Sequence, residues 1–341
     1  MSRTYPGGII TKTPVTPAGP FQCGAAPGIW TLDQQLQAQK LGIWPTAGNA
    51  YGTVAIFALG GTPAISTTRN KYTFSDCVNA VATAASAASA NGSAAGNSTV
   101  GIFALGFTTV AVTTRNKYTY SGCVNAVATA ASAASYYGAA AGNATVGIFA
   151  LGVVGCPSTT RNKYTYSGDV NAAATASSPE SMTGSAAGNS TVGIFALGKS
   201  GTGCCILASS TRNKYTYSGC VNAVATAASV ESYQGAAAGN ATVGIFALGV
   251  VSGIASTTRN KYTYSGCVSA AATAASAASY AGSAAGNATV GIFALGAKPS
   301  AASTTRDKYT YSGCVVSSGT AASAASYLGA AASNGTTGVN V

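Results

Sequence analysis

Histidine is absent from this 341-residue chain, and only six residues are Asp or Glu. Without His, neither a Ser-His-Asp nor a Cys-His catalytic arrangement is available, and no imidazole can bind a metal. So few carboxylates leave little for paired acid–base catalysis or for a cage of oxygen ligands around a hard cation. We therefore predict that the protein is not an enzyme and uses no cofactor or metal.

Long apolar runs are also missing. No stretch of about 18 apolar residues occurs, so the sequence predicts no membrane partner. The start, MSRTYPGGIITK, has no apolar core after its basic residue, so it does not resemble a secretory signal. Apolar residues nevertheless make up 47% of the chain, and charged residues only 7%. That composition favours a folded chain over a disordered one.

What the sequence does contain is a repeat. The segment TVAIFALG at 53–60 returns five times as TVGIFALG, and a degenerate copy, TTGVNV, ends the chain at 336–341. A second motif, TTRNKYTY with small variations, occurs six times, and its arginine recurs at intervals of 46, 46, 51, 47 and 47 residues. Such a period indicates a solenoid or a propeller built from one supersecondary unit.

Each repeat contains recognisable strand patterns. TVGIFALG is a short apolar run bounded by glycine, which predicts a strand buried on both faces. In the first TRNKYT segment, Arg69, Lys71 and Thr73 alternate with Asn70 and Tyr72, which predicts a half-buried strand. The length between these two strands varies most among the repeats, so we expect a surface loop there.

The rest of the repeat is ambiguous. VNAVATAASAAS is rich in alanine, the best helix former, but it has no charged face, and a small-residue strand packing closely on a neighbouring sheet fits as well. AAGN then supplies another short strand or a turn. Four short strands in 46–51 residues are typical of a propeller blade. We predict an all-β protein, a β-propeller of six four-stranded blades, or seven if residues 1–28 supply the missing strands. A solenoid with one helix per repeat is the main alternative.

The order AAGN, TVGIFALG, loop, TRNKYTY and small-residue strand resembles the blade of kelch-type propellers over residues 46–341. The resemblance implies a ring in which the last copy, at 336–341, pairs beside the first repeat. Of the usual double glycine only Gly60-Gly61 is present, and the blade tryptophan is missing. The resemblance therefore concerns architecture and implies no functional residue.

Residues 1–45 have a different character, and we predict an extension with one short helix. Thr31 followed by Gln34 forms a capping-box pattern, and Gly42 and Pro45 would end the helix. The segment GIWTLDQQLQAQKLGIWP resembles a short module near the N-terminus of virion structural and appendage proteins of tailed bacteriophages. It implies a non-enzymatic virion component, as a head or tail appendage, a fibre or a decoration protein. Its partners would be other virion proteins, in a homo-oligomer or in several copies per particle. The candidate anchor residues are Trp30, Leu32, Leu36 and Trp44. The alternative is an ordinary amphipathic helix packed on the propeller rim.

The net charge of +11 follows from the repetition, because twelve of the 17 cations belong to the TRNK motifs. In a closed ring these residues would form a ring of cations that a polyanion could use. Alternatively, they cap loop carbonyls or stack on tyrosines, and we do not predict nucleic acid as a partner. The candidate polyanion ring is Arg69, Lys71, Arg115, Lys117, Arg161, Lys163, Arg212, Lys214, Arg259, Lys261, Arg306 and Lys308.

Tyrosines recur late in four repeats, and tyrosine rings can stack on sugars. They predict a surface that binds a host-surface glycan, either on a virion or in a lectin-like module outside one. The alternative is that the rings fill gaps between blades. The candidate binding residues are Tyr136, Tyr137, Tyr233, Tyr280 and Tyr327.

Five of the nine cysteines occupy one position of the repeat, where the third repeat has Asp169. Equivalent positions in different blades should be too far apart for a disulfide, so we expect small buried thiols. A bridge between loops or subunits stays open for Cys156, Cys204 and Cys205. The five repeat cysteines are Cys77, Cys123, Cys220, Cys267 and Cys314.

Overall fold

A computed structural model describes residues 4–5, 8–9, 31, 33–34, 37, 53–62, 64–74, 78–121, 123–202, 205–299 and 301–335. The chain divides into two units, Met1–Tyr51 with Asn340–Val341, and Gly52–Val339. The ordered elements described in both units are strands, apart from the helical residues Asp33, Gln34 and Gln37. The all-β prediction is therefore confirmed for this part of the chain. Within the described ranges, no helix has the length and hydrophobicity needed to cross a bilayer.

The first unit contains one strand pair and a helix start. Strand β1 (Thr4–Tyr5) pairs antiparallel with β2 (Gly8–Ile9). The Thr31 N–H donates to Gln34 Oε1 at 3.0 Å, and the Gln34 N–H donates to Thr31 Oγ1 at 3.3 Å. These two bonds form the predicted capping box, which is thereby confirmed. The candidate anchor residues Trp30, Leu32, Leu36 and Trp44 lie outside the described residues.

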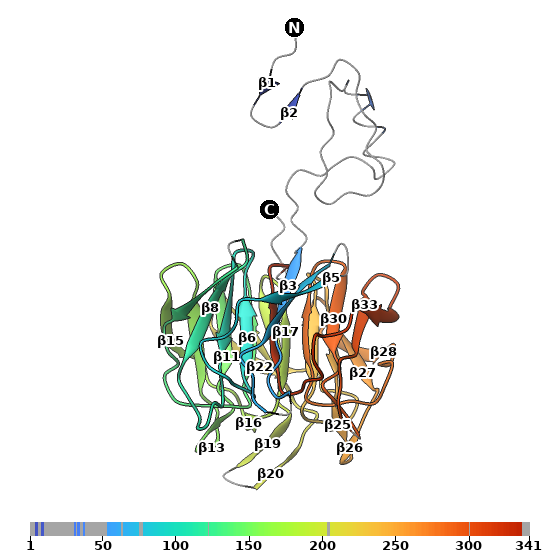
Figure 1. Ribbon diagram of the computed structural model, residues 1–341. Coiled ribbons are helices and arrows are strands. Elements are labelled where there is room, and N and C mark those ends of the chain that lie inside the picture. The colour runs from blue at the N-terminus through green and yellow to red at the C-terminus, as the bar shows by residue number, and fades with distance from the viewer. Residues whose placement is uncertain are drawn as a thin grey trace. The chain divides into compact units, whose positions relative to one another are not determined.

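The second unit contains six antiparallel sheets of four strands with one common order (Figure 1). The first sheet is β35 (Ala330–Ser333), β3 (Val54–Ala58), β4 (Arg69–Thr73) and β5 (Val78–Ala82). The second is β6 (Ser93–Gly96), β7 (Val100–Ala104), β8 (Arg115–Thr119) and β9 (Val124–Ala128). The third is β10 (Ala139–Gly142), β11 (Val146–Ala150), β14 (Arg161–Thr165) and β15 (Val170–Ala174). The fourth is β17 (Ser185–Gly188), β18 (Val192–Ala196), β21 (Arg212–Thr216) and β22 (Val221–Ala225). The fifth is β23 (Ala236–Gly239), β24 (Val243–Ala247), β27 (Arg259–Thr263) and β28 (Val268–Ala272). The sixth is β29 (Ser283–Gly286), β30 (Val290–Ala294), β33 (Arg306–Thr310) and β34 (Val315–Gly319).

The core lies between neighbouring sheets. In one cluster, Ile102 of β7 packs with Phe149 of β11 and Tyr164 of β14, so the cluster joins the second sheet to the third. Each second strand has four buried residues in succession, which confirms the prediction for TVGIFALG. Burying one large apolar side chain, such as that of Ile102 or Phe149, stabilises the fold by about 1.5–3 kcal/mol. The sheets therefore depend on one another for their cores.

The alanine-rich segment forms the outer strand of each sheet. The one-helix-per-repeat alternative is therefore wrong. One face of the strand packs on the neighbouring sheet, as expected, because Ala128 of β9 lies in one cluster with Phe149 and Tyr164 of the third sheet. The strand pairs on one side only, and its valines are exposed, with Val127 at 76% and Val224 at 82%. Alternating Val and Thr suit such a half-paired strand, and pairing with the third strand overrides the helix propensity of alanine.

The first strands, AAAG or SAAG, lie against one another. Strand β6 contacts β10 and β35, β10 contacts β17, β17 contacts β23, and β29 contacts both β23 and β35. Small residues are needed for this approach. A Cβ added at Gly101 of β7 would meet the Tyr120 hydroxyl at 2.7 Å and the Ala332 Cβ at 3.2 Å. The glycine of TVGIFALG therefore allows neighbouring sheets to pack closely.

The first sheet combines the two ends of the second unit. Strand β35, near the C-terminus, pairs antiparallel with β3, and Ala331 lies opposite Phe57. Asn334 extends the pairing, because its Oδ1 accepts a bond from the Val54 N–H at 2.9 Å. The predicted pairing segment, 336–341, lies outside the described residues. The observed partner of the first repeat is the AAAS strand just before it.

The loops between the second and third strands lie at one end of the sheets, where several form small hairpins (Figure 1). The hairpins are β12 (Val153–Val154) with β13 (Cys156–Pro157), β25 (Val250–Val251) with β26 (Ile254–Ala255), and β31 (Ala297–Lys298) with β32 (Ala301–Ala302). The longest loop forms β19 (Lys199–Thr202) and β20 (Cys205–Ala208), joined by β16 (Glu180–Met182). The variable segment is therefore a loop region, as predicted.

Candidate functional site

The six repeat arginines are buried between sheets. Arg69 is fully buried, and its Nη1 donates to Asn125 Oδ1 at 2.7 Å while Nη2 donates to Asn116 Oδ1 at 3.1 Å. Its guanidinium also lies 4.7 Å from the centre of the Phe103 ring. Burial lowers the pKa of Arg69 to about 10, against a small opposing effect of Tyr118. These arginines join each sheet to the next.

The arginine half of the predicted polyanion ring is therefore wrong. A side chain that is at most 1% exposed cannot meet a polyanion, and its Nη groups already donate to partners inside the protein, as those of Arg69 do. Arginine and lysine do share one face, as the alternation predicts, because Arg69 bonds to Asn125 and Lys71 contacts Cys123, both in the second sheet. That face packs on the next sheet, however, rather than facing solvent. The buried arginines are Arg69, Arg115, Arg161, Arg212, Arg259 and Arg306.

One junction carries a buried ion pair. Where the other five repeats have Asn, the sixth has Asp307, and its Oδ2 lies 2.8 Å from Arg259 Nη2. Both side chains are buried, at 0% and 1% exposure. Burial lowers the pKa of Arg259, and the Asp307 carboxylate opposes that effect.

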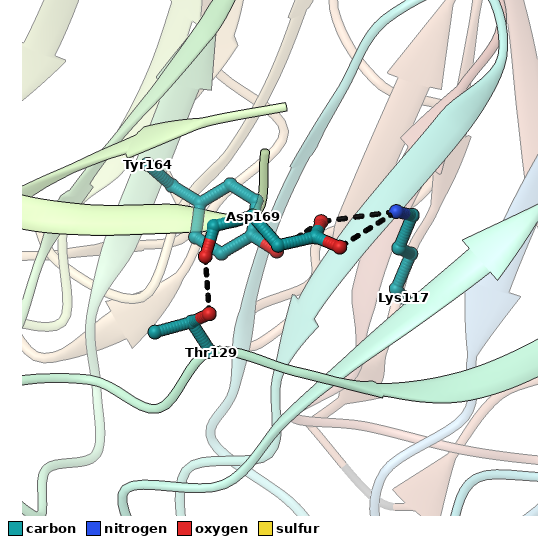
Figure 2. Close-up of polar contacts among 4 residues, drawn as sticks. All are labelled: Lys117, Thr129, Tyr164 and Asp169. Carbon is teal, nitrogen blue, oxygen red and sulfur yellow. Dashed lines mark hydrogen bonds and ion pairs between the residues drawn. The ribbon is translucent and has the colours of Figure 1, made fainter. Parts of the chain in front are cut away.

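The repeat lysines lie half-buried at the same junctions. Lys117 Nζ contacts the two carboxylate oxygens of Asp169 in the next sheet at 3.0 and 2.9 Å, and the Tyr164 hydroxyl donates to the same carboxylate at 2.8 Å (Figure 2). The Thr129 hydroxyl donates to the Asp169 backbone carbonyl. Partial burial raises the pKa of Asp169, but the bonds from Lys117 and Tyr164 outweigh it, so the pKa lies below its ordinary value.

Four other lysines meet a cysteine at the position that corresponds to Asp169. The thiol also lies beside the tyrosine of its own third strand, and burial together with the Cys220 thiol raises the pKa of Tyr215 to about 12. The lysine–cysteine pairs are Lys71–Cys123, Lys163–Cys220, Lys214–Cys267 and Lys261–Cys314. Cys23, Cys77 and Cys204 lie outside the described residues, and Cys156 is exposed in β13.

The loop end of the sheets carries a ring of six backbone hydrogen bonds. The Asn91 N–H donates to the Leu328 carbonyl at 2.9 Å, and the Tyr137 N–H donates to the Asn91 carbonyl at 2.9 Å. The series continues from sheet to sheet and ends where the Leu328 N–H donates to the Ala281 carbonyl at 2.7 Å. We call the six residues the ring residues. They are Asn91, Tyr137, Thr183, Gln234, Ala281 and Leu328.

Every ring residue has a left-handed backbone, with φ between 53° and 59°. A residue other than glycine in that conformation costs about 1–2 kcal/mol. Although the repeats are otherwise nearly identical, these six positions hold six different amino acids. The ring residues and the glycine after each of them line a hollow of about 60 Å³. The chain thus places its most diverse side chains, at an energetic cost, around one opening.

The variable loops adjoin this ring. The residue before each ring residue forms a backbone bridge to the start of a loop, as Tyr136 does with Val153 and Tyr233 with Val250. We call the ring residues, the residues before them and the adjoining loops the variable face. It lies at the end of the sheets where Figure 1 labels β13, β20 and β26.

All five predicted binding tyrosines lie on the variable face, and all are half-buried. Tyr136, Tyr233, Tyr280 and Tyr327 occupy one position, whereas Tyr137 belongs to the ring. The Tyr136 and Tyr137 ring centres lie 5.0 Å apart, and Phe107 lies 5.9 Å from Tyr136. Lys199 Nζ lies 4.3 Å from the centre of the Tyr233 ring. The structure thus brings the tyrosines to one end of the sheets, in two positions rather than one.

Sequence reasoning missed the other ring residues, Asn91, Thr183, Gln234, Ala281 and Leu328. A signal was present in the sequence. In every repeat a glycine precedes the AAAG, SAAG or AAAS segment, and the residue just before that glycine is different each time. In the described part of the chain, no three His, Cys, Asp or Glu residues gather as a metal site would require. Comparison with known proteins finds no family that matches the chain and no curated protein with a significant sequence match.

Proposed function

We propose that the second unit is a six-bladed β-propeller. Two observations support this. The first strands of the six sheets contact one another in an order that returns from β29 through β35 to β6, and the sixth repeat supplies β35 to the first sheet. Pairing a C-terminal strand with the first repeat leaves no unpaired first strand in the ring. Each four-stranded sheet is then one blade.

We further propose that the protein is a non-enzymatic component of a tailed-phage virion, and that its variable face binds a glycan on the host surface. The single observation behind the binding site is the concentration of sequence differences on that face. If the loop end were only structural, six nearly identical repeats would be expected to keep one residue there. Six different side chains, held in a backbone conformation that costs free energy, suit the recognition of a ligand that does not share the symmetry of the ring.

The side chains on the variable face have the chemistry that sugars require. Tyr137 and Tyr136 offer aromatic surface against which the C–H face of a sugar can pack. The amides of Asn91 and Gln234 each provide donors and an acceptor for sugar hydroxyls. No charge is needed for this recognition, and the ring residues carry none.

The virion setting depends on the resemblance of residues 28–45 to phage appendage proteins. In this proposal the first unit anchors the protein to other virion proteins, and the propeller presents its variable face outward in several copies per particle. Mass spectrometry of purified particles from the source tests it. Absence of the chain from the particles would refute the virion assignment without affecting the binding site.

The glycan site is tested with the fluorescently labelled full-length protein on a glycan array. We expect selective binding that Tyr137→Ala or Gln234→Ala weakens at least tenfold. The matched control is Val224→Ala, which shortens an exposed side chain on the outer strand β22 and should leave binding unchanged. Absence of glycan binding, or equal loss in the control, would refute the site.

A polyanion-binding propeller is the alternative function. It now depends on the half-buried lysines, because the arginines are internal. If it were correct, binding to heparin would weaken steeply with salt and would persist in Tyr137→Ala.

A further inference from the structure

Lysine and cysteine meet repeatedly across the junctions between neighbouring sheets. In each pair the lysine comes from the third strand of one sheet and the cysteine from the hairpin that follows the third strand of the next. The Nζ–Sγ distances are 3.7 Å for Lys71–Cys123, 3.8 Å for Lys163–Cys220, 3.8 Å for Lys214–Cys267 and 4.0 Å for Lys261–Cys314. These cysteines are not in disulfides and are half-buried, so a small solute can reach them.

The backbone holds each thiol in this place. Cys123, Cys220, Cys267 and Cys314 all have φ near 50°, a conformation that glycine would adopt at lower cost. The backbone carbonyl of each cysteine also accepts a bond from a threonine of the preceding sheet, as Cys123 does from Thr83. Neither the turn nor this bond needs a thiol. The backbone therefore does not explain why cysteine occupies this position, and we look for the reason in the contacts of its side chain.

The third sheet shows which side-chain chemistry the position takes. Asp169 stands there with φ of 51°, and its carboxylate accepts bonds from Lys117 and Tyr164 (Figure 2). The lysine of the preceding sheet thus faces an anion in this junction. A thiol in the same place faces the same cation, and the thiolate is the form of cysteine that reacts with oxidants.

We propose that the four lysine–cysteine pairs are sites of oxidative cross-linking, in which hydrogen peroxide converts each pair into a sulfenamide that joins consecutive sheets. In the first step the thiolate sulfur attacks peroxide, an S–O bond forms, the O–O bond breaks and the released hydroxide takes up a proton. Sulfur is oxidised by two electrons and peroxide is reduced by two, giving a sulfenic acid and water.

In the second step the neutral lysine amine attacks that sulfur. An S–N bond forms, the S–O bond breaks, and water leaves with a proton from the amine. Thiol, amine and peroxide thus yield a sulfenamide and two waters, and the protein loses two hydrogens per link. The flexible lysine stem allows Nζ to move the remaining distance to sulfur.

The arrangement predicts a definite pattern of links. They would join the first sheet to the second, the third to the fourth, the fourth to the fifth and the fifth to the sixth. The junction of the second and third sheets would hold its ion pair instead, because Asp169 cannot form the bond. Each link would close a loop of more than fifty residues and so constrain the unfolded chain.

The test uses the reduced full-length protein, treated with hydrogen peroxide, blocked with N-ethylmaleimide and digested with trypsin. After partial oxidation, tandem mass spectrometry should find each of the four lysine–cysteine pairs joined, with a mass lower by about 2 Da per link than the sum of the peptides and no cleavage at the linked lysine. Lys117 should carry no link. Lys163→Met should lose only the link to Cys220 and keep the other three, which also shows that the variant is folded.

Asp169→Cys provides a gain of function, since it should add one link, to Lys117. Sulfinic or sulfonic products without joined peptides would overturn the proposal. So would links that involve Lys199 or Lys298 as often as the paired lysines, because those would report random collisions. Failure of Asp169→Cys to gain a link, while its fold is unchanged by circular dichroism, would equally overturn it.

Discussion

Replacing Arg259 should be more damaging than replacing any other repeat arginine, and Arg115 offers the matched comparison. Both guanidiniums are buried and lie over a phenylalanine, Phe293 for Arg259 and Phe149 for Arg115. They differ in what they leave behind. Arg115→Met removes a donor from neutral amide oxygens, whereas Arg259→Met leaves the Asp307 carboxylate with its two bonds from Ser276 but without a counter-charge.

The magnitudes follow from those partners. Without Arg115, Asn162 Oδ1 keeps a bond from the Ser132 N–H at 3.0 Å, so the main loss is the partner of Asn171 Oδ1. One unsatisfied buried acceptor costs about 1–3 kcal/mol. Without Arg259, a carboxylate at 1% exposure loses its counter-charge, and breaking such a buried pair costs about 3–5 kcal/mol. The expected difference is about 2 kcal/mol.

The assay is urea unfolding followed by circular dichroism, with the free energies compared at one denaturant slope. Asp307→Asn gives the control, because it creates the Arg–Asn junction that occurs in the other repeats. The double variant Arg259→Met with Asp307→Asn should recover the stability of Arg115→Met. Equal destabilisation by the two single arginine variants, or no recovery in the double variant, would refute the reasoning.

Three further predictions concern the packing, an ion pair and the anchor. Gly101→Ala should lower the free energy of unfolding by about 1–3 kcal/mol, because the new Cβ meets the Tyr120 hydroxyl at 2.7 Å. Gly155 has no neighbouring atom within 4 Å, so Gly155→Ala should cost about 1–2 kcal/mol only because its φ is +73°. Equal losses of unfolding free energy in the two variants, well below these values, would contradict the packing argument. Because the pKa of Asp169 is depressed in the folded state, its pair with Lys117 should add stability above the ordinary Asp pKa and lose it as the pH falls through the folded value. Thermal melts should therefore show wild type above Asp169→Asn by less than about 1 kcal/mol at pH 7 and level with it near pH 2, and a gap that widens in acid would contradict this sign. Deleting residues 1–45 should leave a soluble protein with an unchanged β-sheet spectrum that no longer enters particles, and undiminished incorporation would refute the anchor.

The repeat let much of the fold be predicted from the sequence. The strand order of a sheet followed from AAGN, TVGIFALG and TRNKYTY, because period, apolar runs and alternation are local signals. The outer strand could not be assigned with the same ease. Alanine favours a helix locally, and only pairing with the third strand, seen between Ala126 and Lys117, decides for a strand.

The candidate site was less predictable, for a physical reason. Alternation describes which residues share a face, but it does not say what covers that face. The face of Arg69 and Lys71 is covered by the next sheet, where Arg69 bonds to Asn125, 56 residues away in sequence. No local pattern contains such a contact. The positively charged ring was therefore expected outside the protein, whereas its arginines serve as internal links.

The ring residues show the opposite case, in which variation rather than regularity carries the signal. Within one chain, nearly identical repeats act as internal controls for one another. A strand position such as Tyr118 or Tyr164 is kept because every junction has the same shape, and both side chains are fully buried. Tyr137 and Thr183 differ although their backbones bond in the same ring. The ring thus holds one backbone conformation at six positions whose side chains differ, and the binding proposal depends on the half-buried ones among them, Asn91, Tyr137, Gln234 and Leu328, rather than on the repeated junctions.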